Sequence, residues 1–376
     1  VRLRANVVVK GRSEMSRISN GQLVIAFLAC RLSSEMITIP GKMVSYGFDR
    51  FAVILFAKLI AALLYLPVIF ITLKFKGDSV ITAAFRRNRA FGITAGIIMS
   101  VLLSATAVQT VLSVQRYVTD TLLNNIVTIS GIAVITASAV YGAVKGLSAV
   151  TRSSVFAAAV FGLLIFLIGV TMWDKVEPDY LYFSFINDRS HFLKTLISEI
   201  SMNSEILIFA VITDELRSKP YKTVIYYLPL LLILMEFLNM LYNLILGPYM
   251  TKVEYPLYII ASLSDIVLFQ RLDGIDAIVW LMCGIIKAAL LIYCIGRIYT
   301  VCSNKPHTTL AVAVSGFLIF MLCVILGSDA GVYARMTKIM NSGIHILIGG
   351  VVVPLVVLIA GRTKQRGRMK KNDENI

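Results

Sequence analysis

Long apolar segments alternate with short polar connections along the chain. Ten segments are close to the roughly 20 residues that a helix needs to cross a hydrocarbon core about 30 Å thick. Those that begin near residues 91, 125, 153, 309 and 340 contain no charged side chain. The ten segments cover approximately 20–40, 51–73, 91–115, 125–144, 153–173, 195–213, 223–247, 274–296, 309–327 and 340–361. This pattern predicts an all-α integral membrane protein with a ten-helix transmembrane domain over 20–361.

The composition excludes a soluble enzyme and a disordered chain. Hydrophobic residues make up 58% of the 376 residues and charged residues 15%, with a mean hydropathy of +0.82. Soluble domains are closer to half apolar and a quarter charged. The sequence contains no glycine-rich phosphate loop, no nucleophile with a base at catalytic spacing, and no Cys or His pattern typical of a metal site. We therefore expect neither an enzyme nor a bound metal or cofactor.

The net charge of +15 reflects membrane topology. Most basic residues outside the apolar segments fall on one side of the membrane if both ends of the chain are cytoplasmic. This distribution follows the positive-inside rule. It predicts cytoplasmic tails at 1–19 and 362–376 that face anionic membrane lipid, and it makes a nucleic-acid partner improbable.

Polar clusters interrupt the first and the sixth segment at corresponding positions. If the ten helices form two copies of five, over 20–173 and 195–361, the second copy must be inverted in the membrane. Transporters built in this way bind ligands near the midplane, where the first helix of each repeat is broken. The clusters Arg31–Glu35 and Ser201–Glu205 both end in Ser-Glu. We therefore predict a break and a ligand site at both clusters; hydrogen bonds between helices, without a ligand, are the alternative.

Ionisable residues inside the membrane need a partner, a cavity or a function. Arg31 and Glu35 are one helical turn apart and can pair. A structural ion pair is the favoured interpretation for Lys58, whereas Lys287 is equally suited to a structural role and to replacing a coupling cation. Glu199 and Glu205 lie on different faces of an unbroken helix. Glu205 is the strongest functional candidate, because a protonatable acid there could also serve proton coupling.

Three runs resemble one family of membrane proteins. They are Ile18-Ser19-Asn20-Gly21-Gln22-Leu23, Gly146-Leu147-Ser148-Ala149-Val150-Thr151-Arg152, and Phe269-Gln270-Arg271-Leu272-Asp273-Gly274-Ile275-Asp276 followed by Trp280. They are similar to runs in the B-type permease subunits of spore germinant receptors, the GerAB family of the amino acid–polyamine–organocation transporter superfamily. The resemblance covers nearly the whole chain between residues 18 and 361, and the Gln-Arg-Leu-Asp…Trp run is its most specific part.

The resemblance implies a LeuT-like fold with a 5+5 inverted repeat, located in the inner membrane of a bacterial spore. It implies an A-type membrane subunit and a C-type lipoprotein as partners, and a small germinant, typically an amino acid, whose binding starts germination. The substrate-binding residues would be Cys30, Ser33, Ser34, Glu35, Ser201, Asn203, Ser204 and Glu205.

The sequence departs from the family pattern within these elements. Ser33 stands where the family usually has a glycine, Ser148 where it commonly has a glutamate, and Met202-Asn203-Ser204-Glu205 where it usually has Pro-Phe-Gly-Glu. Loss of a glycine makes positive φ angles expensive. Two alternatives to a germinant sensor therefore stay open: an amino-acid/cation symporter with net flux, and a scaffold subunit that binds no ligand.

Overall fold

The structure is a computed structural model of the full chain, and the description that follows covers only part of it. The described residues are 17–37, 48–75, 77–122, 128–181, 189–264, 272–303 and 308–360. Both predicted cytoplasmic tails lie almost entirely outside these ranges.

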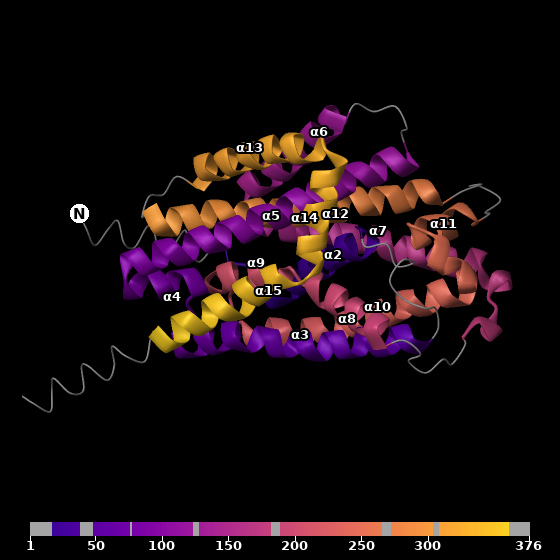
Figure 1. The fold of residues 1–376 in the computed structure, drawn as a ribbon, viewed down its shortest axis with the longest axis horizontal. Helices are drawn as coiled ribbons and strands as arrows, with labels where there is room; N and C mark the ends of the chain where they lie inside the picture. The colour runs from indigo at the N-terminus through magenta and orange to yellow at the C-terminus, as the bar shows by residue number, and fades with distance from the viewer. Residues whose placement is uncertain are drawn as a thin grey trace, which may run out of the picture.

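The described chain is almost entirely helical, and most helices run along one common direction (Figure 1). The long helices are α2 (Asn20–Ile37), α3 (Phe48–Lys74), α5 (Arg89–Thr121), α6 (Thr128–Lys145), α7 (Leu147–Thr171), α8 (Arg189–Ser201), α10 (Tyr221–Leu246), α12 (Asp273–Ser303), α13 (Thr308–Gly327) and α14 (Ala330–Asn341). The shorter helices are α4 (Val80–Arg87), α9 (Glu205–Ile212), α11 (Pro256–Ser262) and α15 (Ile344–Ile346). A π-helical segment, Leu347–Val352, continues α15 into a helix that reaches Ala360.

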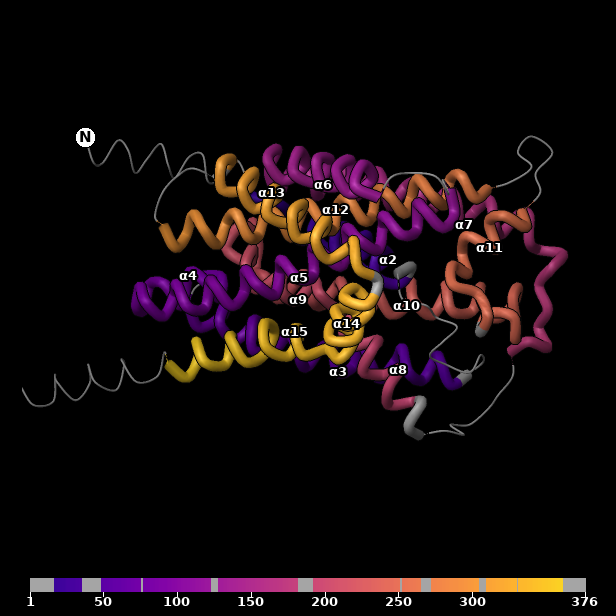
Figure 2. The backbone as a smooth tube through the Cα atoms, turned by 45° about the horizontal axis from the view of Figure 1, so that its top comes forward, coloured from indigo at the N-terminus to yellow at the C-terminus, as the bar shows by residue number. Residues whose placement is uncertain are grey.

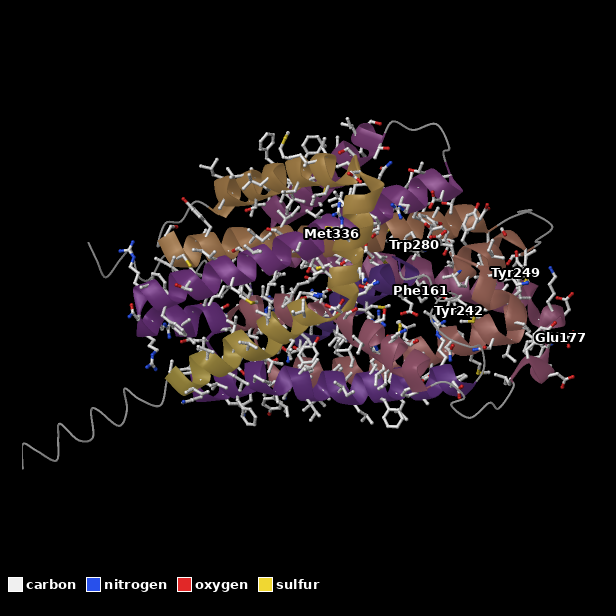
Figure 3. All side chains as sticks on the ribbon, in the orientation of Figure 1. Phe161, Glu177, Tyr242, Tyr249, Trp280 and Met336 are labelled. Atoms are coloured by element: carbon white, nitrogen blue, oxygen red, sulfur yellow. The ribbon has the colours of Figure 1, made fainter. Side chains whose placement is uncertain are left out.

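The helices have the length and apolar character of membrane spans. Among the described residues, eight helices could cross a membrane, or nine if the bent pair α14–α15 counts as one span. Large apolar side chains cover the outside of the bundle, including Leu63, Phe166 and Ile233, each at least 63% exposed (Figure 3). The chain is an integral, multi-pass membrane protein, because only lipid can cover so much apolar surface.

Length and hydropathy identify at most nine spans among the described residues, one fewer than the ten predicted from the sequence. The missing one is α2, the first predicted span, which contains Asn20, Arg31 and Glu35. In Figure 1 this helix lies within the bundle, where it packs against α5, α7, α10 and α12. A helix that is surrounded by protein can retain polar side chains, because these find partners on its neighbours.

The order of long and short helices is the same in the two predicted halves. Short helix α4 follows the second span of the first half, and short helix α11 follows the second span of the second half. These two helices lie at opposite ends of the bundle (Figure 1), as an inverted arrangement requires. We name these ends the α4 end and the α11 end. The repeat itself stays a prediction.

Both limits of the described chain lie at the α4 end. Ile18 forms a parallel bridge with Leu216, just beyond α9, and Asp214 beside this bridge accepts a hydrogen bond of 2.9 Å from Thr82 of α4. Lys74, at the end of α3, donates to the carbonyl of Leu358 at 3.2 Å. A chain that enters and leaves at the same end crosses the bundle an even number of times.

Two spans are broken at the same level. The sixth predicted span, 195–213, is divided into α8 and α9 by a break at residues 202–204. The tenth, 340–361, is the second part of a bent pair: α14 crosses the bundle (Figure 2) and meets the following helix at 53°. Gly343 makes the bend with φ of +74°, a region that favours glycine.

The predicted break in the first span is wrong for the described residues. Helix α2 runs without interruption from Asn20 to Ile37, through Arg31, Ser33 and Ser34. Ser33 favours a continuous helix, because serine weakens a helix less than the glycine that the family usually has at this position.

Candidate functional site

A small cavity of about 30 Å³ lies at the level of the two breaks. Residues from five regions line it: Ser34 of α2; Thr106, Gln109 and Thr110 of α5; Ser201, Met202 and Ser204 around the α8–α9 break; Lys287 of α12; and Met340, Asn341 and His345 around the α14–α15 bend. Among the described residues the lining is polar apart from the two methionines, and Lys287 is the only lysine, arginine or carboxylate side chain in it. A space of this size holds about one water molecule.

The α8–α9 break forms because its residues compete with the helical backbone. The side-chain amide of Asn203 donates to the carbonyls of Glu199, at 3.0 Å, and Ile200, at 2.9 Å. The Ser201 hydroxyl donates to the carbonyl of Ser198 at 2.6 Å. Asn and Ser are residues that form such local hydrogen bonds and so favour helix ends. The break is therefore stable without help from a proline or glycine.

The α14–α15 bend lies directly beside the α8–α9 break. A Cβ atom at Gly343 would lie 3.7 Å from the Cβ of Ser201. In the π-helical segment, a Cβ at Gly349 would lie 2.3 Å from Leu207, and one at Gly350 would lie 2.6 Å from Ile206. The two glycines therefore allow the π-helical segment to approach α9 closely. Such π-helical turns occur frequently at functional sites.

Lys287 connects two spans of different halves at the cavity wall. Its ammonium group donates a hydrogen bond to the hydroxyl of Ser34, so that α12 is tied to α2. Lys287 is 4% exposed. A buried ammonium group of this kind requires a compensating negative charge nearby.

Glu205 supplies that charge and has an unusual environment. It is the first residue of α9 and is completely buried. Lys287 is the charged residue that acts most strongly on it, ahead of Arg31 and Lys58. Neither carboxylate oxygen of Glu205 has a hydrogen-bond partner among the described residues. Buried polar atoms are nearly always paired, so an unpaired carboxylate indicates a place where a ligand, an ion or water binds.

Other unpaired polar groups gather around Glu205. The Ser204 hydroxyl, the Tyr65 and Tyr227 hydroxyls and the Nδ1 atom of His345 have no hydrogen-bond partner in the part of the chain described here. Both tyrosines are fully buried and interact electrostatically with the carboxylate of Glu205. Their rings belong to an aromatic cluster with Phe27 and Phe209, with centroids 5.5–6.4 Å apart. The cluster holds the hydroxyl groups in place on rigid side chains.

Five other buried charged residues form a paired network on the α8 side of the break. The Arg31 guanidinium is 3.0 Å from the carboxylate of Glu35, one turn along α2 as the spacing predicts, and it also binds Glu199 of α8. Arg50 binds Glu35 at 2.8 Å, and the Lys58 ammonium is 3.6 Å from Glu199. These five residues join α2, α3 and α8, and we call them the buried charge network.

The α4 end is closed below the cavity. All eight residues of α9 are buried. Just beyond it, Arg297 of α12 pairs with Asp214 at 3.2 Å and with Glu215 at 2.6 Å, and the Tyr293 hydroxyl donates to Glu215 at 2.8 Å. The segment before α2 covers this cluster through the Ile18–Leu216 bridge. A ligand would therefore have to reach the cavity from the direction of the α11 end.

The structure brings together only some of the predicted site residues. Ser34, Ser201 and Ser204 line the cavity, and so does Lys287. Cys30, Ser33, Asn203 and Glu205 are buried beside the wall without lining the cavity, Cys30 and Glu205 being close enough to interact electrostatically. Glu35 lies in the buried charge network with Arg31, Lys58 and Glu199.

Sequence reasoning missed the contributions of α5 and of the bend. Thr106, Gln109 and Thr110 occupy one face of an apolar span, a spacing that could have indicated a polar wall. Asn341 and His345 lie close to Gly343, but the sequence alone did not place this segment near residue 201. Arg50 immediately precedes the second predicted span, 51–73, and the structure buries it: it is 5% exposed and bound to Glu35.

Comparisons with solved structures identify the fold. No protein-family model matches the sequence, and no curated protein matches it. The structure is similar to that of a Na⁺-coupled sialic acid symporter in a substrate-bound outward-open state, with a TM-score of 0.62 and 15% identity over 92% of this chain and 89% of that one. It is also similar to a mutant of the manganese transporter of Eremococcus coleocola, with a TM-score of 0.56 and 16% identity over 90% of this chain and 78% of that one. The all-α, LeuT-like transporter fold expected from the sequence is thereby confirmed.

Proposed function

We propose that this protein binds a small polar ligand in the cavity at the α8–α9 break and converts binding into a change of conformation. The observation that carries the proposal is the unpaired, fully buried carboxylate of Glu205 beside a cavity lined by hydroxyl and amide groups and by Lys287. A ligand that donates hydrogen bonds in this region would satisfy groups that otherwise have no partner.

Binding must move helices. The cavity holds about one water molecule, and an amino acid is several times larger. The ligand-bound form therefore has a wider cavity than the form described above. A ligand shifts an equilibrium only if it binds one form better, and the difference in cavity size supplies that preference.

We further propose that the chain acts as the germinant-sensing subunit of a spore germination receptor, with an amino acid as germinant. The support is the resemblance of its three sequence runs to the GerAB family, together with the LeuT-like fold. In this proposal the chain resides in the spore inner membrane with both termini in the cytoplasm. It works there with an A-type membrane subunit and a C-type lipoprotein, and co-purification with neighbouring gene products would test these partners.

Glu205→Gln tests the binding site. The ligand is first identified as the proteinogenic amino acid that raises the melting temperature of the purified protein. Glutamine keeps the shape of the Glu205 side chain and removes its charge, so we expect the affinity for this amino acid to fall at least tenfold. Stability should fall less than on breaking an ion pair, because Glu205 compensates the charge of Lys287 without forming a contact ion pair with it among the described residues. Glu199→Gln is the matched control, since it breaks a buried ion pair beside the break and should lower stability. Unchanged affinity in Glu205→Gln would remove this residue from the site.

A symporter with real substrate flux is the second candidate. Lys287 favours it, because an ammonium group tied to α2 can occupy the position of a coupling cation and exchange its proton during a transport cycle. Uptake of the labelled amino acid into proteoliposomes separates the two functions, since a sensor binds the ligand without net accumulation. A scaffold subunit would show no binding to any amino acid in calorimetric titration.

A further inference from the structure

A second, larger depression of about 730 Å³ lies next to the cavity and shares Asn341 with it. Its walls come from α5, α8 and α14, and α14 packs against both of the other helices (Figure 2). Of the described residues that line it, three are basic, namely Arg116, Lys194 and Lys338, and none is acidic. We call it the basic depression.

The three basic side chains lack acidic partners. Each of them is exposed, and none forms an ion pair in the part of the chain that the structure describes. Asp120 is one turn from Arg116 on α5, but it accepts a hydrogen bond from Tyr255 and does not line the depression. Exposed basic groups without acidic partners are solvated by water or bind an anion, and their charge is open to a ligand at this depression.

Arg116 is held in position on the depression wall. The Arg116 guanidinium carbon lies 4.1 Å from the ring centroid of Tyr333, in a cation–π contact. The Tyr333 hydroxyl is in turn 3.1 Å from that of Ser113. A guanidinium group fixed on an aromatic ring keeps its N–H groups free for an oxyanion, at a lower cost in entropy than a mobile side chain.

An unpaired buried hydroxyl also lines the depression. Ser198 of α8 is 2% exposed, and its hydroxyl has no hydrogen-bond partner among the described residues. It lies one turn before Ser201, which lines the cavity. A polar route therefore leads from the basic depression past α8 and Asn341 to the cavity.

A ligand on this route meets positive charge from the entrance to the bottom. It passes Arg116, Lys194 and Lys338 and reaches Lys287; among the described residues no Asp or Glu lines either space, and the carboxylate of Glu205 lies behind the cavity wall. The field of such a lining concentrates anions and repels cations. We infer that the ligand carries a carboxylate that is not neutralised by its own positive charge, as in an acidic amino acid or a small dicarboxylate, and that the basic depression captures it before it enters the cavity.

This inference rests on the proposed function, because it assigns a charge to the same ligand, but its first test needs no ligand. Ala334, an exposed residue of the depression, is replaced by cysteine in protein reconstituted in neutral phosphatidylcholine. The rate of modification is then compared for an anionic reagent, methanethiosulfonate ethylsulfonate, and a cationic one, methanethiosulfonate ethyltrimethylammonium. The matched control is Ser328→Cys, an exposed position beside Asp329. The protein that carries neither added cysteine gives the background rate of modification.

We expect the anionic-to-cationic rate ratio at Ala334→Cys to exceed that at Ser328→Cys at least about tenfold, and to decrease with added salt. Combining Ala334→Cys with Arg116→Gln, Lys194→Gln and Lys338→Gln should remove most of the difference, and these exposed positions should not disturb folding. Equal ratios at the two positions would overturn the inference. A preference that disappears when phosphatidylglycerol is added would instead assign the depression to lipid headgroups.

The second test uses the similarly sized probes L-glutamate, L-glutamine and L-lysine in equilibrium binding to the same protein. We expect L-glutamate to bind most tightly and to lose at least tenfold in affinity in the triple variant. Tighter binding of L-glutamine or L-lysine would overturn the inference while leaving the proposed binding function intact. If no probe binds, the proposed amino-acid function fails for these probes, and the thiol-reagent ratio decides whether the basic depression selects anions.

Discussion

Two groups of buried polar residues on either side of the α8–α9 break differ in whether their charged side chains form ion pairs. In the buried charge network, Arg31 and Lys58 contact carboxylates, and helix α2 continues unbroken through it. Around the cavity, Glu205 and Ser204 have no hydrogen-bond partner among the described residues, and both nearby spans are broken. The difference teaches that burial of a charge does not by itself mark a site, since a paired charge holds helices together while an unpaired one is available to a ligand.

Arg31→Gln is expected to have the largest effect of the substitutions that test this comparison. It removes the partner of Glu35 and Glu199 at once and leaves two buried carboxylates with weaker compensation. Breaking a buried ion pair costs about 3–5 kcal/mol. Thermal or denaturant unfolding in detergent should show this loss, whereas Glu205→Gln should lose clearly less, because it breaks no contact ion pair. Equal loss in both variants would mean that the two regions do not differ.

Gly350→Ala tests the close contact between the π-helical segment and α9. The new methyl group would lie 2.6 Å from a side-chain methyl of Ile206, so one of the two helices must move. Overpacking of this kind costs about 1–3 kcal/mol. The unfolding midpoint should decrease, and the ligand affinity should change with it because α9 begins at Glu205.

Gly162→Ala in α7 is the control for Gly350→Ala. No atom lies within 4 Å of its added Cβ, and it should be neutral or slightly stabilising. If Gly350→Ala also proves neutral, the contact between the π-helical segment and α9 is looser than described.

Gly343→Ala tests the bend between α14 and α15. Its φ of +74° is strained for any residue with a Cβ, and the cost is about 1–2 kcal/mol, although the added Cβ would lie at an ordinary contact distance of 3.7 Å from Ser201. Unfolding measurements should show this smaller loss. Gly343→Asn is a matched variant, because asparagine tolerates this conformation better, and it should recover part of the stability. No recovery with asparagine would assign the loss to crowding at Ser201.

Ser33→Gly has the smallest expected effect on stability, and it tests directly whether α2 opens when the ligand binds. A glycine within α2 should lower stability by about 0.5–1 kcal/mol. If ligand binding requires α2 to open near the cavity, the same change should increase ligand affinity, because part of the cost of unwinding is removed. Ser33→Ala deletes the hydroxyl and keeps the helix, so its affinity should not increase. Lower affinity in Ser33→Gly than in Ser33→Ala would show that α2 stays helical in the bound form.

Local chemistry made several features predictable. The Asn203 and Ser201 side chains bond to carbonyls a turn earlier, so the break in the sixth span follows from residues within it. The pairing of Arg31 with Glu35 follows from their spacing of one turn. The break expected in α2 failed because its serines and flanking apolar residues tolerate a helix, and because α3 and α8 supply partners for its charges.

By itself, the sequence determined that this chain is a multi-pass helical membrane protein and where its sixth apolar span is interrupted, because hydrophobic length and local hydrogen bonding depend only on neighbours along the chain. Tertiary structure decided the contacts between helices. It brought Arg50 to Glu35, placed Lys287 against Ser34, and positioned the α14–α15 bend beside the α8–α9 break. Contacts between residues on different helices depend on how the helices pack, and packing is a property of the folded bundle.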